Sequence, residues 1–231
     1  MAEKWPIHTV VLDMDDTLFA ERDYVLSGFR AAGAWLVRER GVAGFAEEAQ
    51  RLFEAGRRGR IFNEALATLT ESKTDSWVAE LIAVYREHQP QLRLLPEAES
   101  FLIWARPRFR LALVSDGFLA VQQRKAHALG LAQWMDHLVF TDQWGRESWK
   151  PAQRGFEEVV RLNPGDAEGY VYVADNPRKD FIAPRALGWK TVRVRRSGGE
   201  HAAYEPTADE AADQEIDSLD ALGALLKPCR P

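Results

Sequence analysis

The stretch that decides the fold is Val10-Val11-Leu12-Asp13-Met14-Asp15-Asp16-Thr17-Leu18, in which an apolar run meets three carboxylates. The run begins at Ile7 and is rich in β-branched residues, which is typical of a buried strand. Carboxylates grouped at the end of such a strand repel one another and lose hydration, so a cation or a proton must lie among them. The stretch therefore predicts a buried strand with a functional site at its carboxyl end.

The composition is that of a soluble globular protein. The 231 residues are 46% hydrophobic and 28% charged, with a net charge of −5 and a pI near 5.6. This acidic balance gives no sign of a nucleic-acid-binding surface. Cys229 is the single cysteine, which excludes a disulfide framework and a cysteine-ligated metal site. Because the sequence shows no apolar signal region and no run of about 20 apolar residues, we expect a cytoplasmic protein without a membrane partner. Nothing in the sequence indicates an oligomeric state.

Two patterns divide the chain. Residues 21–93 have a helical period throughout, which predicts a small helical bundle inserted after the first strand. Residues 1–20 and 94–231 alternate helices with short apolar strands, which predicts an α/β core domain with a Rossmann-like parallel sheet. In the insert we predict helices over Ser27–Arg40, Phe45–Arg58, Ile61–Leu69 and Trp77–His88. In the core we predict further strands over Arg110–Val114, His137–Phe140, Tyr170–Ala174 and Lys190–Val194, and helices over Pro96–Arg106, Phe118–Leu129, Pro151–Leu162, Asp180–Leu187 and Ser218–Leu226.

Polar side chains gather where the predicted strands end. They are Asp13 and Asp15 after the first strand, Ser115 after the second, Lys150 in the segment that follows the third, and Asp175 after the fourth, with Asp180 five residues later. In an open parallel sheet, ligands bind beyond the carboxyl ends of the strands. Oxygen ligands without histidine or cysteine suit a hard cation such as Mg²⁺. A lysine beside that cation suits an anionic substrate, and phosphate is the obvious candidate.

These residues also carry a family resemblance. They are similar to the four ordered motifs of the haloacid dehalogenase-like (HAD) hydrolase superfamily: Asp13-Met14-Asp15-Asp16-Thr17, Ser115, Lys150-Pro151 and Asp175-Asn176-Pro177-Arg178-Lys179-Asp180. The resemblance covers Ile7 to Ala20 and Leu94 to Val194. The helical insert resembles the cap that this family carries between its first and second motifs. Ala174 and Asp16 depart from the pattern, because many members have glycine at both places, but neither change removes a functional group.

The resemblance implies a phosphatase that hydrolyses the phosphate monoester of a small metabolite. Asp13 would be the nucleophile and would form an aspartyl-phosphate. Asp15 would act as general acid and then as general base, which requires a setting that raises its pKa relative to that of Asp13. Mg²⁺ would bind the carboxylates of Asp13 and Asp175 and the backbone carbonyl of Asp15.

The other motif residues would support this chemistry. Thr17 and Ser115 would donate hydrogen bonds, Ser115 to a phosphoryl oxygen. Lys150 would offset the negative charge around Asp13. Asp180 would hold Lys150 or a metal-bound water, with Asn176 beside it in the same motif, and Asp116 would join Ser115 in binding the substrate.

Three further residues have two interpretations each. Arg57 belongs to a basic cluster in the insert, which is either a solvated helix end or, if the insert closes over the site, a contact to a second anionic group of the substrate. Trp144 and Trp149 flank the Lys150 segment and would either pack in the core or line the pocket.

Other functions share this chemistry. A phosphomutase of the β-phosphoglucomutase type uses the same aspartyl-phosphate but returns the phosphoryl group to the sugar, so product analysis separates it from a phosphatase. A phospho-signalling receiver domain also uses an aspartate, a hydroxyl and a lysine around Mg²⁺. Receivers lack a large helical insert, however, and phosphorylate an aspartate after the third strand, where this chain has Thr141-Asp142. A haloacid dehalogenase is disfavoured because such enzymes lack the second aspartate, here Asp15.

Overall fold

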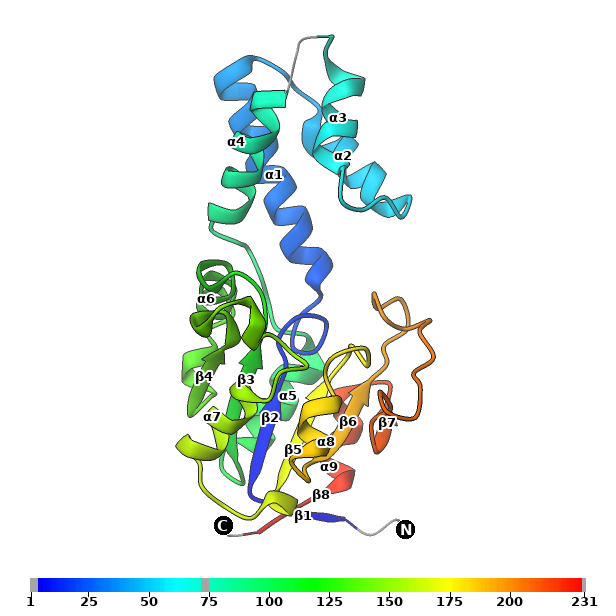
Figure 1. The fold of residues 1–231 in the computed structure, drawn as a ribbon. Helices are drawn as coiled ribbons and strands as arrows, with labels where there is room; N and C mark the ends of the chain where they lie inside the picture. The colour runs from blue at the N-terminus through cyan, green and yellow to red at the C-terminus, as the bar shows by residue number, and fades with distance from the viewer. Residues whose placement is uncertain (1–3, 72–74, 230–231) are drawn as a thin grey trace. The chain divides into compact units, whose positions relative to one another are not determined.

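A computed structural model describes residues 4–71 and 75–229 of the chain (Figure 1). The chain forms two compact units. One, which we call the core unit, consists of the chain up to Ala20 and the chain from Arg93 onward, and the other, the helical unit, consists of Glu21–Leu92. None of the helices in the described ranges is long and apolar enough to cross a bilayer.

The core unit is built on a six-stranded parallel sheet with the order β4-β3-β2-β5-β6-β7. The strands are β2 (Thr9–Leu12), β3 (Arg110–Ser115), β4 (His137–Phe140), β5 (Tyr170–Ala174), β6 (Lys190–Val194) and β7 (Gln214–Ile216). Every residue of β2 and β5 is buried, which explains their continuous apolar runs, since a parallel sheet is covered on both faces. The predicted α/β fold with a parallel sheet is confirmed.

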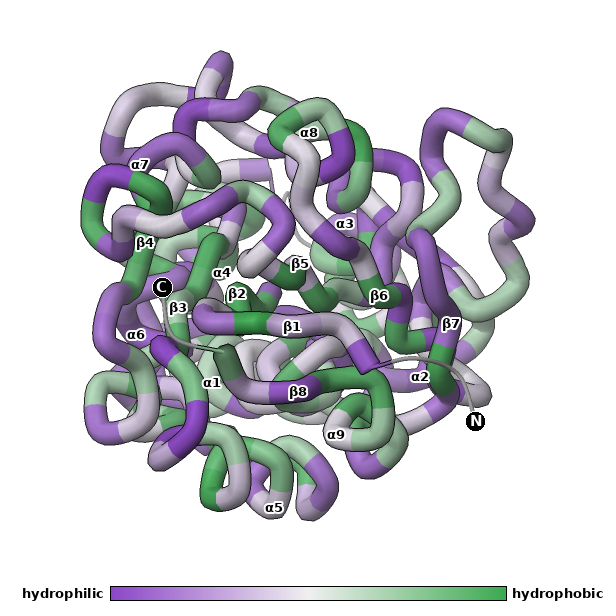
Figure 2. Tube along the Cα trace, turned by 90° about the horizontal axis from the view of Figure 1, so that it is seen from below, coloured by the Kyte–Doolittle hydropathy of each residue, from purple (hydrophilic) through white to green (hydrophobic). Residues whose placement is uncertain are grey.

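Helices cover both faces of this sheet. They are α5 (Pro96–Ala105), α6 (Leu119–Ala128), α7 (Arg154–Leu162), α8 (Ile182–Ala186) and α9 (Leu222–Leu225), together with short 3₁₀ turns at Leu131–Gln133, Thr141–Trp144, Arg146–Ser148, Ala167–Gly169 and Leu219–Ala221. Figure 2 shows α7 and α8 on one face of the sheet and α5 and α9 on the other. The face under α7 packs Val11, Val114 and Tyr172 against Phe156. A separate pair of parallel strands, β1 (Trp5–Ile7) and β8 (Leu226–Pro228), joins the two ends of the chain.

The helical unit contains α1 (Glu21–Arg40), α2 (Phe45–Glu54), α3 (Ile61–Leu69) and α4 (Asp75–Glu87). Its own apolar core includes Phe29, Leu36 and Leu66. Gly28 on α1 lies directly beneath the ring of Tyr85 on α4, because a Cβ at this position would be 2.3 Å from that ring. The glycine therefore permits the close approach of α1 and α4.

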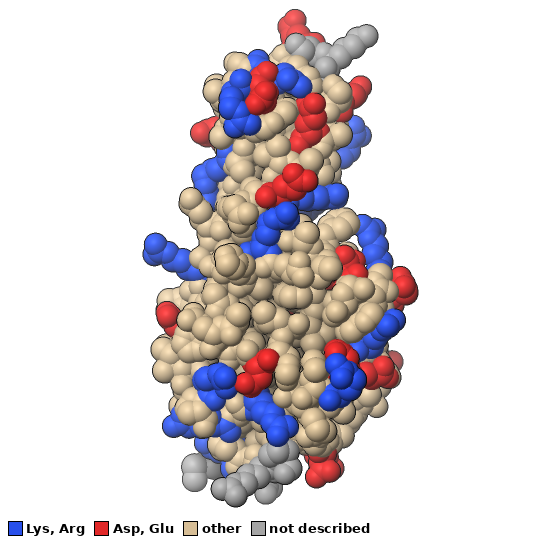
Figure 3. Space-filling model, turned by 90° about the vertical axis from the view of Figure 1, so that its left-hand side faces the viewer, with Lys and Arg blue, Asp and Glu red and all other residues tan. Residues whose placement is uncertain are grey.

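Charge is mixed on the surface. On the face drawn in Figure 3, lysine and arginine side chains lie among aspartate and glutamate side chains, and no broad area has a single sign. The described residues on this face therefore offer no continuous basic track for a polyanion.

The structure corrects several predicted boundaries. The first strand is interrupted at His8, whose N–H donates to the Gly169 carbonyl at 2.9 Å. The first helix begins at Glu21 rather than Ser27. Its first turn carries acidic side chains, whose negative charge interacts favourably with the helix dipole. The second helix ends at Glu54 rather than Arg58, shortly before Gly56, which has φ +80°.

The remaining corrections concern the last third of the chain. α7 begins at Arg154 rather than Pro151, and α8 covers only Ile182–Ala186 of the predicted range. The predicted helix over residues 218–226 is a 3₁₀ turn followed by α9, and it ends as the chain enters β8. β7 and β8 were not predicted. Both are three-residue edge strands with exposed positions, so they carry no apolar run or alternation that sequence reasoning could detect.

Candidate active site

The register of the central strands brings the predicted residues to one edge of the sheet. Leu12 of β2 pairs with Leu113 of β3 and with Val173 of β5. Asp13 follows Leu12 directly, and its N–H donates to the Val173 carbonyl at 2.9 Å. Ser115 is the last residue of β3 and Asp175 the first residue after β5. The carboxyl ends of the three strands are thus adjacent, as parallel pairing requires.

A buried lysine lies at the centre of this edge. The ammonium group of Lys150 is 2.6 Å from Asp13 Oδ1 and 2.7 Å from Asp180 Oδ1, and it donates to the hydroxyl of Tyr172 at 2.9 Å. The side chain of Lys150 is fully buried, and Asp13 is 6% exposed. The second oxygen of Asp180 accepts from the N–H of Asn176 at 3.0 Å. Three strand-end segments are therefore joined through one ammonium group.

Burial sets the titration of this cluster. Loss of hydration raises the pKa of Asp13 to about 6, although the charge of Lys150 opposes the shift. Burial disfavours the charged form of Lys150, but Asp13 and Asp180 outweigh it and raise the pKa of Lys150 well above its ordinary value. Lys150 therefore remains charged beside two carboxylates. A charged lysine at this position is suited to offset negative charge around Asp13.

The carboxyl group of Asp175 lacks a cationic partner among the residues that the structure describes. It forms no hydrogen bond or ion pair with the residues that the structure describes. Burial, followed by the nearby charges of Asp180, Asp13 and Asp16, raises its pKa well above the ordinary value. No group of three or more His, Cys, Asp or Glu side chains in the described ranges could hold a metal ion by itself. A hard cation here fits two carboxylates, those of Asp13 and Asp175, if backbone oxygen completes the set.

Asp15 is held by two side chains that sequence reasoning did not single out. Its Oδ2 accepts from Gln122 Nε2 at 2.8 Å, and its Oδ1 lies 2.7 Å from the ammonium of Lys125. Both partners come from α6, and they are 2% and 4% exposed, respectively. Their spacing of three residues places them on one helix face. That spacing was visible in the sequence, but nothing local connected it to Asp15.

Asp116 is occupied by internal contacts. Its carboxylate accepts from the Thr141 hydroxyl at 2.7 Å and from the Lys150 N–H at 3.1 and 3.2 Å, and it pairs with Lys179 at 3.1 Å. Burial opposes its ionisation, but the charges of Lys150 and Lys179 outweigh burial and lower its pKa. The carboxylate of Asp116 thus connects the segments that carry Thr141, Lys150 and Lys179, and its role in substrate binding stays a prediction.

The turn after β2 holds Asp16 and the predicted site residue Thr17. Asp16 has φ +52°, in the left-handed region. It therefore adopts the backbone conformation that suits the glycine common at this position in the family. Thr17 is fully buried, and its hydroxyl oxygen has no hydrogen-bond partner among the described residues. Ser115 is 1% exposed, and its hydroxyl oxygen lies 3.2 Å from the amide nitrogen of Gln122.

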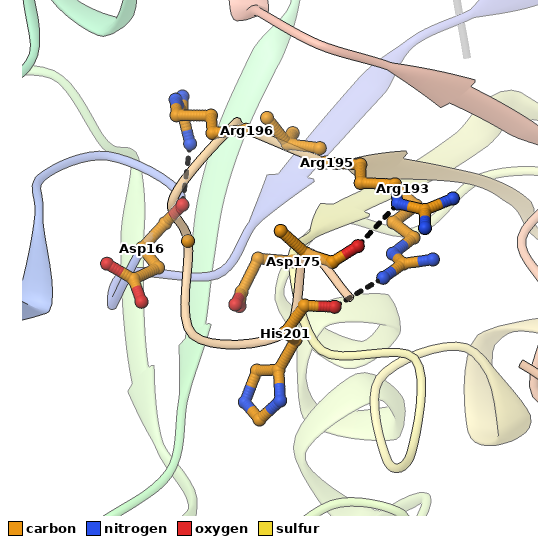
Figure 4. A pocket seen from close by; sticks show the side chains of 9 residues that line it. Asp16, Asp175, Arg193, Arg195, Arg196 and His201 are labelled. Carbon is orange, nitrogen blue, oxygen red and sulfur yellow. Dashed lines mark hydrogen bonds between the residues drawn. The ribbon is translucent and has the colours of Figure 1, made fainter. Parts of the chain in front are cut away.

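A small pocket opens beside Asp175 (Figure 4). Asp16 and His201 line it together with residues from the end of β6. Arg196 donates to the carbonyls of Asp16 and Thr17 at 2.5 and 2.9 Å, and its Nε donates to Glu97 at 2.9 Å. Arg196 therefore ties the turn after β2 to the end of β6, a contact that sequence reasoning missed.

The remaining candidates are Trp144, Trp149 and Arg57. The indole N–H of Trp149 donates to Asp142 at 2.9 Å, and Trp144 packs against the core cluster under α7. Arg57 is an exposed residue of the helical unit that pairs with Glu64 at 2.9 Å. Its interpretation as a solvated helix end accounts for this contact.

Comparisons with known proteins identify the family of the chain. The chain matches the family model of the haloacid dehalogenase-like hydrolases over residues 7–188. It is 27% identical to a glyceraldehyde 3-phosphate phosphatase of Methanopyrus kandleri, over 96% of this chain and 99% of that protein. It is 31% identical to a phosphoserine phosphatase of Thermus thermophilus, over 60% of this chain and 55% of that protein. Its fold is also similar to the magnesium-bound structure of a HAD-hydrolase from Bacillus subtilis, with a TM-score of 0.66, 18% identity, and coverage of 96% of this chain and 99% of that one.

Proposed function

The chain belongs to the haloacid dehalogenase-like hydrolases, and from this premise we propose that it is a phosphatase that forms an aspartyl-phosphate on Asp13. The observation that carries the proposal is the buried carboxylate of Asp13, paired with Lys150 at 2.6 Å, at the edge of the sheet where Asp175 and Ser115 also lie. A buried nucleophilic carboxylate beside a fixed cation is suited to attack on a dianionic phosphoryl group, because the cation offsets the charge that the two anions bring together.

The proposed reaction has two steps. In the first, a carboxylate oxygen of Asp13 bonds to phosphorus, the bond from phosphorus to the ester oxygen breaks, and Asp15 gives its proton to that oxygen. In the second, Asp15 takes a proton from water, the water oxygen bonds to phosphorus, and Asp13 is released with inorganic phosphate. Ser115 and Thr17 would donate hydrogen bonds; the buried hydroxyl of Thr17, which lacks a partner among the described residues, supports this role.

We also propose Mg²⁺ as the cofactor. The carboxylates of Asp13 and Asp175 and the backbone carbonyl of Asp15 would hold it. When bound, the ion would supply positive charge against the phosphoryl oxygens. The raised pKa of Asp175 supports this assignment, because burial and then the nearby charges of Asp180 and Asp13 disfavour its charged form, and a bound cation would offset both effects.

The substrate that we propose is a small phosphorylated metabolite, with glyceraldehyde 3-phosphate as the first candidate. The similarity to the Methanopyrus kandleri phosphatase supports this choice, because it extends over nearly the whole of both proteins. We further propose that the helical unit corresponds to the cap of the family, with Arg57 as a candidate contact to a second anionic group.

The test is phosphate release from p-nitrophenyl phosphate and from glyceraldehyde 3-phosphate. We expect Asp13→Asn to lower kcat by more than about 1,000-fold, because the amide is a poor nucleophile. Asp217→Asn, at an exposed position, is the matched control and should leave turnover unchanged. Normal turnover in Asp13→Asn would refute the mechanism, and an isomerised sugar phosphate as product would indicate a mutase instead.

A further inference from the structure

We propose that Gln122 and Lys125 of α6 are positioning residues that fix the carboxylate of Asp15 for proton transfer. This inference rests on the proposed function, in which Asp15 is the general acid and base. Each oxygen of Asp15 has its own partner, Gln122 for Oδ2 at 2.8 Å and Lys125 for Oδ1 at 2.7 Å. Two independent contacts on opposite oxygens fix the rotation of the carboxylate as well as its position.

Gln122 is oriented for this contact by its surroundings. Its amide nitrogen donates to Asp15 and also to the backbone carbonyl of Asp116, and it lies 3.2 Å from the Ser115 hydroxyl. An amide nitrogen has two hydrogens, and both are needed for the carboxylate and the carbonyl. With the amide reversed, its oxygen would face two acceptors, so only one orientation is stable. The same side chain therefore connects Asp15 to the end of β3, where Ser115 would bind a phosphoryl oxygen.

Lys125 supplies a buried charge. Its side chain is 4% exposed, whereas that of Asp15 is 21% exposed. The ammonium group also lies 5.8 Å from the centre of the Phe19 ring. A charged group that is removed from water requires a partner in good geometry. The pair is asymmetric: the lysine is enclosed, and the carboxylate retains an accessible side on which a substrate oxygen or a water could approach.

The position of Asp15 matters most when the leaving oxygen is basic. An alkoxide must be protonated as it departs, whereas p-nitrophenolate leaves without that help. kcat/KM reports the steps up to formation of the aspartyl-phosphate, and kcat also includes its hydrolysis, in which Asp15 acts as base. A defect in the positioning of Asp15 therefore reduces kcat/KM for an alkyl ester and spares kcat/KM for p-nitrophenyl phosphate.

The experiment compares the two esters in Lys125→Met and Gln122→Leu. Because general acid catalysis contributes about 100- to 10,000-fold, we expect kcat/KM for glycerol phosphate to fall by about 100-fold and that for p-nitrophenyl phosphate by less than about 5-fold. Lys125→Arg retains the charge and should restore part of the alkyl activity. Arg124→Met and Gln123→Leu, on the same helix, are the controls and should leave both activities unchanged; Arg124 donates to the Ala120 carbonyl within α6, and Gln123 is exposed.

The outcomes separate the two proposals. If the unaltered protein hydrolyses neither ester, the proposed function fails. If it hydrolyses both, but Lys125→Met and Gln122→Leu reduce the two kcat/KM values by equal factors, the residues are merely structural and the positioning role is wrong. Circular dichroism identifies a variant that does not fold, and in that case the other variant decides, because the two side chains contact different oxygens of Asp15.

Discussion

Asp13 shows how one buried residue can be costly to the fold and useful to the site. Its carboxylate loses nearly all contact with water, and the single ammonium of Lys150 is shared with Asp180. The result is a pKa near 6, whereas the ordinary value is 3.8. The charge of Asp13 therefore destabilises the folded, metal-free protein at neutral pH.

The pH dependence of stability follows from this shift. Between pH 6 and pH 3.8 the folded protein holds a proton on Asp13 that the unfolded chain does not, so Asp13 stabilises the fold as the pH falls through 6. Asp13→Asn removes this titration. The comparison is made in magnesium-free buffer. We expect the free energy of unfolding of Asp13→Asn minus that of the native protein to be about 1 kcal/mol larger at pH 8 than at pH 5, because only the native protein loses stability as Asp13 ionises. Urea unfolding of both proteins at pH 5 and pH 8 measures this difference. The same difference at both pH values would contradict the raised pKa of Asp13.

At the scale of the elements, contacts between helices and loops bring side chains to the residues that follow β2. α6 presents Gln122 and Lys125 on one face, and the end of β6 presents Arg196 to the turn after β2. Gln122 and Lys125 belong to a regular helix, which is a rigid support, whereas Arg196 lies two residues after the end of β6. In the helical unit, the corresponding contact is that of α1 with α4.

Gly28 tests that contact. Alanine normally stabilises a helix by about 1 kcal/mol relative to glycine. Here its Cβ would lie 2.3 Å from the Tyr85 ring, so we expect Gly28→Ala to lower the free energy of unfolding by about 1–3 kcal/mol. The same substitution in a Tyr85→Ala background should lose this penalty, because the ring is gone. Additive effects in the two backgrounds, measured by urea unfolding, would show that the contact is not responsible.

At the scale of the whole molecule, the sheet assembles a site from segments that are far apart in the chain. The loops after β2, β3 and β5 meet at one edge only because these strands are neighbours in the order of the sheet. The magnesium site that we propose depends on this convergence, since Asp13 and Asp175 follow different strands.

Metal binding gives a prediction at this scale. A ligand that binds the folded state alone raises its stability by mass action. We therefore expect Mg²⁺ to raise the Tm of the metal-free protein, and excess chelator to abolish both this shift and phosphatase activity. Asp175→Asn should lose most of the Tm shift, whereas Asp217→Asn should keep it. A full shift in Asp175→Asn, or activity that survives the chelator, would exclude the proposed site.

The sequence by itself determined the class of fold and most of the residues at the sheet edge. Buried parallel strands must be continuously apolar, so β2, β3 and β5 were visible as runs, and a polar residue directly after each run was conspicuous. The carboxyl ends of the strands in such a sheet share one edge, so the sequence alone predicts that Asp13, Ser115 and Asp175 lie together.

Only the tertiary structure decided which other side chains reach those residues. Gln122 and Lys125 had the spacing of any helix face, Lys179 lay unremarked inside a motif, and Arg196 followed the last buried strand like an ordinary surface residue. Their partners are 107, 110, 63 and 180 positions away in the chain. A carboxylate directly after an apolar strand can be recognised in the sequence, because its burial is unfavourable without a function. The cation or amide that pairs with such a carboxylate can come from any segment that the fold brings near. No local sequence pattern therefore identifies this partner.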